Sequence, residues 1–252
     1  MDFVVAVPSY RRKEKLQKQT LAFLEQQKVP KERITIFLAN QEEYEEYKSA
    51  LPDYCLVVGK QSLSDQRLFI SHYYPIGTKV VSLDDDIKKI KFLRPDLDFI
   101  TLGNLMFRHC QTENLTFWGI YPVNNLYYCH DRVRKGGLYI ANCAFGFIST
   151  HDLAEWLPKD GTKEEVWHTL YRIQQEGSVL RYEGACPDTQ YYGSGGLSTT
   201  RTVEKEKADS LYVASLFPAL CSYVDKKNGH PDVRIKRFVL STYSLFPTVD
   251  GS

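Results

Sequence analysis

The sequence lacks several features that would each point to one class of protein. No uninterrupted apolar run reaches about 18 residues, so we expect no membrane-spanning helix. Lys and Arg number 32 against 31 Asp and Glu, which excludes a strongly basic protein that binds nucleic acid over its whole surface. The N-terminus has no basic segment ahead of its first apolar run, so we expect no signal peptide and a cytoplasmic location.

The common cysteine and nucleotide motifs are also missing. The six cysteines include no CxxC pair, which excludes the usual zinc and thiol redox motifs and predicts free thiols. Neither GxGxxG nor GxxxxGK[ST] occurs, which excludes a dinucleotide fingerprint and a P-loop. Apolar residues at 43% and charged residues at 25% are typical of a globular protein, and without repeats or linkers we expect one domain over residues 1–252.

What the first third of the chain does contain is a regular alternation of strand and helix patterns. Short apolar runs predict strands, and amphipathic segments between them predict helices. The predicted strands are 3–7, 34–39, 54–58 and 79–83, and the predicted helices are 13–27, 41–51 and 62–74. Because crossovers of this kind are right-handed, the pattern predicts an α/β fold with a Rossmann-type, mostly parallel sheet and helices on both faces.

The rest of the chain is less regular. Its patterns predict helices at 99–110 and 162–176 and strands at 118–122 and 179–182. Gly136 and Gly137 indicate a turn before a long strand over 138–149, and 208–223 reads as a helix interrupted at Pro218.

Polar residues follow each of the four predicted parallel strands. The carboxyl ends of such strands share one edge of the sheet, where ligands bind. We therefore expect one crevice lined by Pro8, Ser9, Tyr10 and Arg11, by Ala39, Asn40 and Gln41, by residues 59–67, and by Asp84, Asp85 and Asp86.

The three consecutive aspartates are the strongest chemical signal. Like charges repel, and strands disfavour Asp, so a cation is expected to hold Asp84, Asp85 and Asp86 together. Mg²⁺ sites often combine one or two carboxylates with substrate phosphates. The alternative is a solvated acidic turn neutralised by Lys88 and Lys89.

Other residues allow two interpretations each. Arg11 and Arg67 suit phosphate or planar groups, or are surface arginines, and Tyr10 either stacks on a base or lies at a rim. Glu165 either completes a helix capping box with Thr162 or acts as a general base. The loop with Gly195 and Gly196 is either an anion-binding nest or flexible, and His230 is a loop residue or a weak candidate for a metal ligand.

Basic residues concentrate in two places despite the near-zero net charge. Such runs are solvated faces or local contacts to a phosphate backbone. One group is Lys226, Lys227, Arg234, Lys236 and Arg237, and the other is Lys88, Lys89, Lys91 and Arg94.

Taken in order, several segments resemble a known family. VAVPSYRR (5–12), FLANQEE (37–43), Arg67 and SLDDD (82–86) are similar to GT-A glycosyltransferases. WGIYPVNN (118–125), AFGF (144–147) and GGL (195–197) resemble, more narrowly, the TET/JBP-associated glycosyltransferases of phages and large viruses. The resemblance spans roughly residues 3 to 200, so the last 50 residues match least and the third metal ligand stays open.

The resemblance implies a metal-dependent hexosyl- or pentosyltransferase. A nucleotide-sugar donor, usually a UDP-sugar, would give its sugar to a hydroxymethylated pyrimidine such as hydroxymethylcytosine in DNA, in the host cytoplasm for a phage or viral enzyme. Residues 1–90 would bind the nucleotide sugar and residues 91–252 the acceptor. Mn²⁺ or Mg²⁺ would be bound by Asp84 and Asp86 of the DXD motif.

The resemblance also implies individual roles. The donor nucleotide would contact Pro8, Ser9, Tyr10, Arg11, Ala39, Asn40, Gln41, Arg67, Asp84 and Asp85. Where the family has Glu-Asp, this chain has Glu164-Glu165, so either carboxylate is a candidate base. Trp118, Gly195 and Gly196 would contact the acceptor or the diphosphate, and Trp118, Tyr127 and Tyr128 would stack against a flipped base.

Two alternatives remain. The same fold could act on a glycan or a protein, or the chain could be a non-catalytic nucleotide-sugar binding module. The intact aspartate triplet argues against the second. The stereochemistry of transfer and the oligomeric state stay open.

Overall fold

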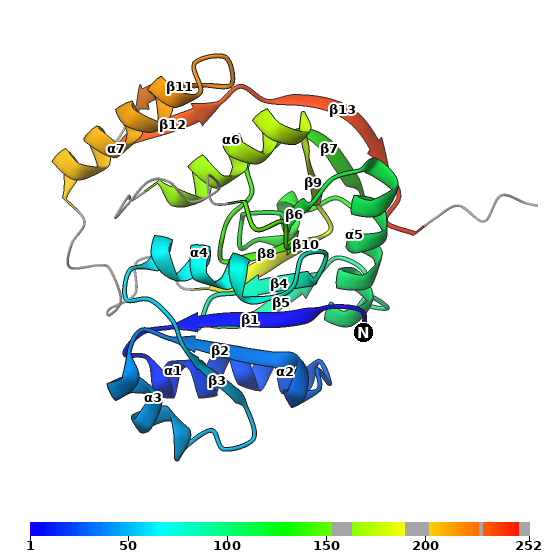
Figure 1. Cartoon of the computed structure of the whole chain (residues 1–252). Coiled ribbons are helices and arrows are strands. Elements are labelled where there is room, and N and C mark those ends of the chain that lie inside the picture. Colours follow the sequence, from blue (N-terminus) through cyan, green and yellow to red (C-terminus); the bar gives the residue numbers. More distant parts are fainter. Residues whose placement is uncertain (153–162, 190–201, 227–228, 247–252) are drawn as a thin grey trace, which may run out of the picture.

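The computed structural model describes residues 1–152, 163–189, 202–226 and 229–246 (Figure 1). Within these residues, nine strands form one central sheet. They are β1 (Val4–Ser9), β2 (Ile34–Leu38), β3 (Cys55–Val58), β4 (Lys79–Leu83), β6 (Phe117–Ile120), β7 (Val133–Gly137), β8 (Ala144–Ile148), β9 (Val179–Tyr182) and β13 (Phe238–Tyr243). Their order across the sheet is β13-β7-β9-β6-β8-β4-β1-β2-β3.

Two small antiparallel pairs and a set of helices complete the described structure. The pairs are β5 (Ile87–Phe92) with β10 (Ala185–Thr189) and β11 (Cys221–Asp225) with β12 (Pro231–Ile235). The helices are α1 (Lys13–Leu16), η1 (Gln17–Leu21), α2 (Ala22–Gln26), η2 (Lys31–Arg33), α3 (Gln41–Lys48), α4 (Leu63–Tyr73), α5 (Phe99–Glu113), η3 (Leu126–Tyr128), α6 (Glu164–Glu176) and α7 (Val203–Leu216).

The four strands predicted in the first third of the chain are confirmed as the parallel part of the sheet. β1 lies between β2 and β4 and is parallel to both, and β3 is parallel to β2. β8 is antiparallel to its neighbours β4 and β6, and β7 is antiparallel to β9 and β13. The remaining strands share one direction, so the predicted mostly parallel α/β sheet is confirmed.

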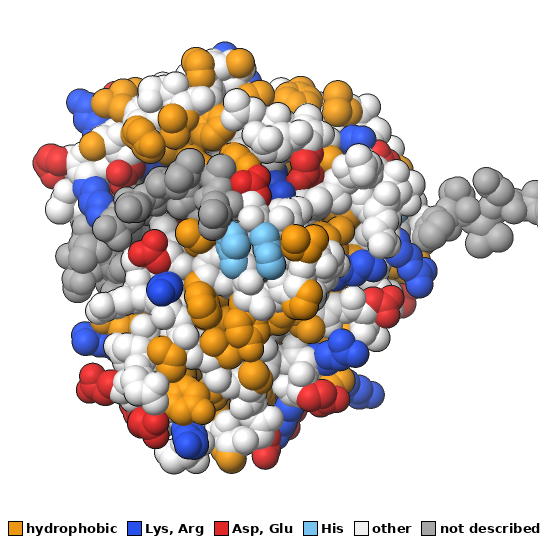
Figure 2. All heavy atoms as spheres, in the orientation of Figure 1, with side chains coloured by type: hydrophobic (Ala, Val, Ile, Leu, Met, Phe, Trp, Pro, Cys, Tyr) orange, Lys and Arg blue, Asp and Glu red, His pale blue; other side chains and the backbone are white. Residues whose placement is uncertain are grey.

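Helices cover both faces of the sheet because its central strands bury side chains in both directions. Val5 and Val7 of β1 belong to the core beneath α1, α2, α3 and α5, whereas Ala6 belongs to the core beneath α4 and α6. A third core joins α6 to α7, β11 and β12, which lie beyond α6 in Figure 1. On the face shown in Figure 2, hydrophobic side chains gather over α4, where Tyr73 is 42% exposed.

Capping side chains begin two of the helices as the sequence predicts. Asn40 accepts a hydrogen bond from the Glu43 backbone N–H at the start of α3, and Ser62 does the same for Asp65 at α4. Each satisfies a backbone donor that the helix leaves open. Both helices thereby start directly after a strand-end loop.

Three expectations for the later part of the chain are wrong. Gly136 and Gly137 lie in β7 and make no turn, because the edge strand β13 approaches too closely for a side chain: a Cβ on Gly136 would lie 2.2 Å from the Phe238 carbonyl oxygen. The predicted long strand over 138–149 is only β8. The helix predicted over 208–223 is α7, which ends before Pro218, and the residues beyond it form β11.

No helix in the described part of the chain is long and apolar enough to cross a membrane. The central sheet takes strands from both 1–90 and 91–252. The division of labour between those two halves stays a prediction.

Candidate functional site

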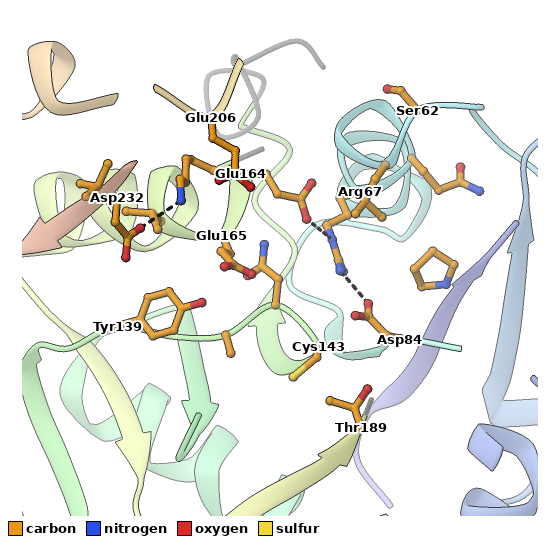
Figure 3. Close-up of a pocket in the computed structure, with 18 of the residues that line it drawn as sticks. Ser62, Arg67, Asp84, Tyr139, Cys143, Glu164, Glu165, Thr189, Glu206 and Asp232 are labelled. Carbon is orange, nitrogen blue, oxygen red and sulfur yellow. Dashed lines mark hydrogen bonds and ion pairs between the residues drawn. The ribbon is translucent and has the colours of Figure 1, made fainter. Parts of the chain in front are cut away.

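A cleft of about 1290 Å³ opens where β1, β2 and β4 end. Its walls come from the strand-end loops, the start of α4, the loop before β8, the start of α6, and the region of β11 and β12 (Figure 3). Segments far apart in the sequence therefore meet at the carboxyl edge of the parallel strands, as the topology predicted.

Most of the predicted site residues line this cleft. They are Pro8, Ser9, Tyr10, Ala39, Arg67, Asp84, Asp85, Asp86, Glu164 and Glu165. Arg11, Asn40, Gln41 and Trp118 are not part of the lining. Gly195, Gly196, Lys227 and Thr162 lie outside the described residues.

In the loop after β1, Arg12 lines the cleft, whereas the sequence suggested Arg11. Arg11 has a left-handed backbone (φ 54°) and stacks its guanidinium over Tyr10, 5.0 Å from the ring centroid. The backbone then reverses, and Arg12 lines the cleft. Its Nη1 lies 3.2 Å from Asp85 Oδ1 and 3.3 Å from Asp86 Oδ2.

Glu43 of α3 stabilises this turn. Its carboxylate accepts hydrogen bonds from the backbone N–H of Arg11 at 2.5 Å and of Ala39 at 3.1 Å. Because it is 5% exposed and binds both loops, Glu43 connects the ends of β1 and β2. Tyr47 of the same helix accepts from the Arg12 backbone N–H at 3.1 Å.

Arg67 occupies the centre of the cleft floor between two carboxylates (Figure 3). Its Nη2 donates to Asp84 Oδ1 at 2.8 Å, and its Nε donates to Glu164 Oε1 at 3.1 Å. Nη1 donates to the Ser82 hydroxyl. Arg67 is 3% exposed, and all three nitrogens of its guanidinium donate to protein groups. The buried guanidinium therefore holds Asp84 and Glu164 in position.

Burial and mutual repulsion act on the acids around Arg67. Burial raises the pKa of Asp84 and of Glu164, and the nearby positive charge of Arg67 offsets only part of this effect. The pKa of Arg67 is itself raised: burial would lower it, but the two carboxylates outweigh that effect. The arginine therefore stays charged, and each carboxylate depends on it for its own charge.

The second and third aspartates are held by protein cations. Ser9 donates to Asp85, whose pKa is raised to about 6 by burial despite Arg12 beside it. Both oxygens of Asp86 are engaged: Oδ1 accepts from Thr189, and Oδ2 lies 3.1 Å from the Lys15 ammonium as well as near Arg12. No sequence pattern marked Lys15, because its place depends on how the helical segment that continues from α1 into η1 and α2 packs against β5.

The carboxylate oxygens of Asp84 are better placed to bind a divalent cation than those of Asp86. The Asp84 side chain is 33% exposed, and its Oδ2 has no hydrogen bond within the described residues. Both carboxylate oxygens of Asp86 are already engaged by protein groups. In the described part of the chain no three His, Cys, Asp or Glu side chains form a preassembled metal site. One carboxylate completed by water and substrate phosphates is a usual Mg²⁺ arrangement, which the cleft allows.

The structure separates the two candidate bases at the start of α6. Glu164 is 8% exposed and accepts from Arg67 and, at 3.5 Å, from Ser64, so its carboxylate has a structural role. Glu165 lines the cleft and is partly exposed. Thr162, the cap that the sequence suggested, lies outside the described residues; the N-cap of α6 is Lys163, which makes no side-chain cap, and Glu165 is the second helical residue.

The aromatic residues proposed for base stacking lie away from the cleft. Trp118 is 2% exposed and packs edge-on against Phe107, so its position in the core corrects the expectation of a direct contact with the acceptor. Tyr127 and Tyr128 are 84% and 52% exposed, but neither lines the cleft. Their stacking role stays a prediction.

Basic residues of the C-terminal part form one rim of the cleft. Lys226, Arg234, Lys236 and Arg237 are all in the lining. Lys226 forms an ion pair with Asp232, and Lys236 donates to the Pro218 carbonyl. Arg234 and Arg237 are exposed and have no ion pair among the described residues. Lys88 and Lys89, by contrast, lie on β5 outside the cleft.

No protein-family model matches the chain, and no curated protein sequence matches it. Solved structures do. Glucosyl-3-phosphoglycerate synthase from Mycobacterium tuberculosis, solved with UDP, is 8% identical with a TM-score of 0.54, covering 96% of this chain and 89% of that one. The same enzyme with Mn²⁺, UDP-glucose and phosphoglyceric acid is 7% identical with a TM-score of 0.52 and the same coverage. A mycobacterial protein is 8% identical with a TM-score of 0.53, covering 98% and 88%.

Identities this low show a shared fold and nothing finer. The chain therefore has a GT-A-like nucleotide-sugar transferase fold.

Proposed function

We propose that the chain is a glycosyltransferase that moves a sugar from a UDP-sugar to a hydroxyl group of an acceptor. One observation carries this proposal: a single cleft joins an aspartate triplet after β4 to a carboxylate pair at the start of α6. The similar enzyme from Mycobacterium tuberculosis was solved with UDP-glucose and Mn²⁺. A donor diphosphate near the aspartates would leave its sugar facing Glu164 and Glu165.

On the donor side, the loops after β1 and β2 would hold the nucleoside. Ser9, Tyr10 and Ala39 line the cleft there, and Glu43 fixes the spacing between the two loops. Asp84 would bind Mn²⁺ or Mg²⁺ together with the donor phosphates. The bound cation supplies charge stabilisation to the departing diphosphate.

Glu165 is our candidate for the general base. In an inverting displacement the acceptor hydroxyl gives its proton to the Glu165 carboxylate while its oxygen bonds to the anomeric carbon, and the bond from that carbon to the diphosphate breaks. Glu164 keeps Arg67 in place. Glu165 lines the cleft and is partly exposed, whereas Glu164 is 8% exposed, so an acceptor hydroxyl can reach Glu165 more easily.

For the acceptor we propose a hydroxymethylated pyrimidine in DNA, as the resemblance to TET/JBP-associated glycosyltransferases implies. The basic rim supports a polyanionic acceptor, because Arg234 and Arg237 lie on the cleft edge without ion-pair partners in the described residues. Phosphate groups of a nucleic-acid backbone would provide the missing counter-charges. A neutral glycan would not.

The decisive experiment presents DNA that contains 5-hydroxymethylcytosine or 5-hydroxymethyluracil together with Mn²⁺ and a panel of UDP-sugars. Digestion to nucleosides and mass spectrometry would detect a sugar-modified base, with unmodified DNA and the Glu165→Gln variant as controls. We expect a new glycosylated nucleoside only with the modified DNA and the intact protein. Donor binding without any DNA product would favour the alternative, transfer to a glycan or a protein.

A further inference from the structure

The cleft contains a buried amide that has no partner. Asn142 is in the cleft lining and is 1% exposed. Within residues 1–152, 163–189, 202–226 and 229–246, neither its Oδ1 nor its Nδ2 makes a hydrogen bond. Among the described residues, no other side chain leaves two buried polar atoms without a partner.

Such an amide is unusual because burying polar atoms without hydrogen bonds costs free energy. Nearly all buried side-chain polar groups in proteins have a partner, and the exceptions call for an explanation such as a water molecule or a ligand. An asparagine amide offers both a donor and an acceptor. A ligand group that satisfies the Asn142 amide should therefore be able both to accept and to donate a hydrogen bond.

Hydrogen bonds hold the backbone on both sides of Asn142, and the resulting position indicates which kind of ligand could reach its amide. On one side, the backbone N–H of Ile140 donates to Thr169 in α6 at 3.3 Å. On the other side, the carbonyl oxygen of Cys143 accepts from the backbone N–H of Asp84 at 3.0 Å. Asn142 therefore lies on a loop that contacts the middle of α6 on one side and the aspartates at the end of β4 on the other, and it lines the same cleft as the candidate base at the start of α6. Under the proposed function, the transferred sugar would lie between those aspartates and that base.

The charges around this interval disfavour an anionic partner. Asp84, Glu164 and Glu165 line the same cleft, and Arg67, which is paired with two of them, supplies one positive charge against their three carboxylates, so a phosphate or a carboxylate that lacked a cation of its own would be repelled. A sugar hydroxyl is neutral, and it both donates and accepts. We propose that Asn142 binds hydroxyl groups of the transferred sugar and thereby selects among nucleotide sugars. This inference rests on the proposed function.

The test compares a ligand that carries the sugar with one that lacks it. Titration calorimetry with Mn²⁺ would measure UDP and whichever of UDP-glucose, UDP-galactose, UDP-N-acetylglucosamine and UDP-xylose binds the intact protein most tightly. We expect Asn142→Ala to weaken binding of that UDP-sugar about tenfold, the effect of one or two lost hydrogen bonds, and to leave the affinity for UDP unchanged. Asn104→Ala, which removes an amide on α5 that binds the Asp2 backbone N–H, is the control and should change neither affinity.

A second measurement distinguishes a ligand contact from a structural one. Because no group of the described residues bonds to the Asn142 amide, Asn142→Leu should leave the melting temperature of the ligand-free protein equal or higher, as replacing an unsatisfied buried polar group does. A clear fall in melting temperature, together with equal losses of UDP and UDP-sugar binding, would identify Asn142 as structural and overturn the inference.

The remaining outcomes separate the inference from the function on which it rests. If the intact protein binds UDP and UDP-sugar but Asn142→Ala weakens both equally or neither, the inference fails and the proposed function stands. If the intact protein binds no UDP compound at all, both fail together.

Discussion

Arg67 and Asp84 form an ion pair of 2.8 Å that connects α4 to the end of β4. The same guanidinium donates to Glu164 and so reaches the start of α6. Three elements that are distant in the sequence thus depend on one buried arginine for their relative positions. This arrangement makes Arg67 a positioning residue for both sides of the proposed reaction.

We expect Arg67→Ala to destabilise the protein and to weaken donor binding. Removing one partner of a buried ion pair typically costs about 3–5 kcal/mol of unfolding free energy, because the other charge stays buried without compensation. UDP affinity should fall because Asp84 loses its orientation. Urea unfolding and calorimetry would measure the two effects. Arg94→Ala is the control: it removes an arginine from an exposed pair with Asp96 and should change little. Unchanged UDP affinity in Arg67→Ala would refute the positioning role.

The two glutamates should respond differently to the same substitution. We expect Glu165→Gln to lower the single-turnover transfer rate by about 10²–10⁴-fold with an unchanged melting temperature, because Gln cannot take the proton. Glu164→Gln should instead lower the melting temperature, since it weakens the ion pair with Arg67. A wild-type rate in Glu165→Gln combined with a loss of rate in a well-folded Glu164→Gln would assign the base to Glu164.

Transfer should require a divalent cation. Excess chelator should abolish the activity, and Mn²⁺ or Mg²⁺ should restore it, because the leaving diphosphate needs counter-charge. Asp84→Asn should weaken UDP binding only when Mn²⁺ is present. Asp86→Ala should instead lower the melting temperature with or without metal, since Lys15 loses its partner and Arg12 loses one of its two. Full activity in chelator would exclude metal dependence.

Stability below neutral pH should depend on Glu183. Burial alone would raise the pKa of this carboxyl, but hydrogen bonds from Arg181 and Arg132 and the nearby charge of Arg134 hold it below its ordinary value of 4.5. A depressed pKa stabilises the fold above 4.5, and the stabilisation is lost as pH falls through the lower, folded-state value. Glu183→Gln should therefore cost about 3–5 kcal/mol at pH 7 and progressively less below pH 4.5. Urea unfolding of both proteins across this range would measure the difference, and a difference independent of pH would contradict the expectation.

Binding to DNA should weaken steeply with salt. Each phosphate contact that is lost should reduce the slope of log K against log salt by about 0.9. Replacing basic residues of the rim with Ser should therefore flatten the dependence, and a Lys88→Ser, Lys89→Ser double variant, which alters β5 outside the cleft, should not. The residues of the rim to replace are Lys226, Arg234, Lys236 and Arg237, and Lys227, which lies outside the described residues, would be replaced with them because it follows Lys226 in the sequence. Fluorescence anisotropy at several salt concentrations would decide it, and affinity independent of salt would point to a non-nucleic-acid acceptor.

The elements that could be predicted are those whose sequence signals lie within or next to the element itself. The first four strands are short apolar runs buried in the sheet, and α3 and α4 begin at Asn40 and Ser62, whose side chains cap them. These signals lie within a few residues of the structure that they specify. The bounds of β8 had no such signal: the sequence predicts a strand over 138–149, but only Ala144–Ile148 forms it, antiparallel to β4 and β6, which are distant in the sequence. Gly136 and Gly137 likewise depend on Phe238, about a hundred residues later.

The sequence by itself determined which side of the sheet carries the site, because consecutive parallel strands with right-handed crossovers must end at the same edge. The place of Asp84, Asp85 and Asp86 follows from that rule alone. Only the tertiary structure decided which side chains enter the cleft. Arg12 does so in place of Arg11 because Glu43 of α3 holds the Arg11 backbone in its left-handed conformation.

Packing also decided which predicted residues take part at all. Trp118 is in the core because Gly146 on the neighbouring strand leaves room for its indole ring: a Cβ there would lie 2.1 Å from the ring nitrogen. Glu164 is paired with Arg67 across 97 residues of sequence, which leaves Glu165 as the partly exposed acid. Such contacts depend on side chains that meet only after folding, so no local pattern of apolar and polar residues could have revealed them.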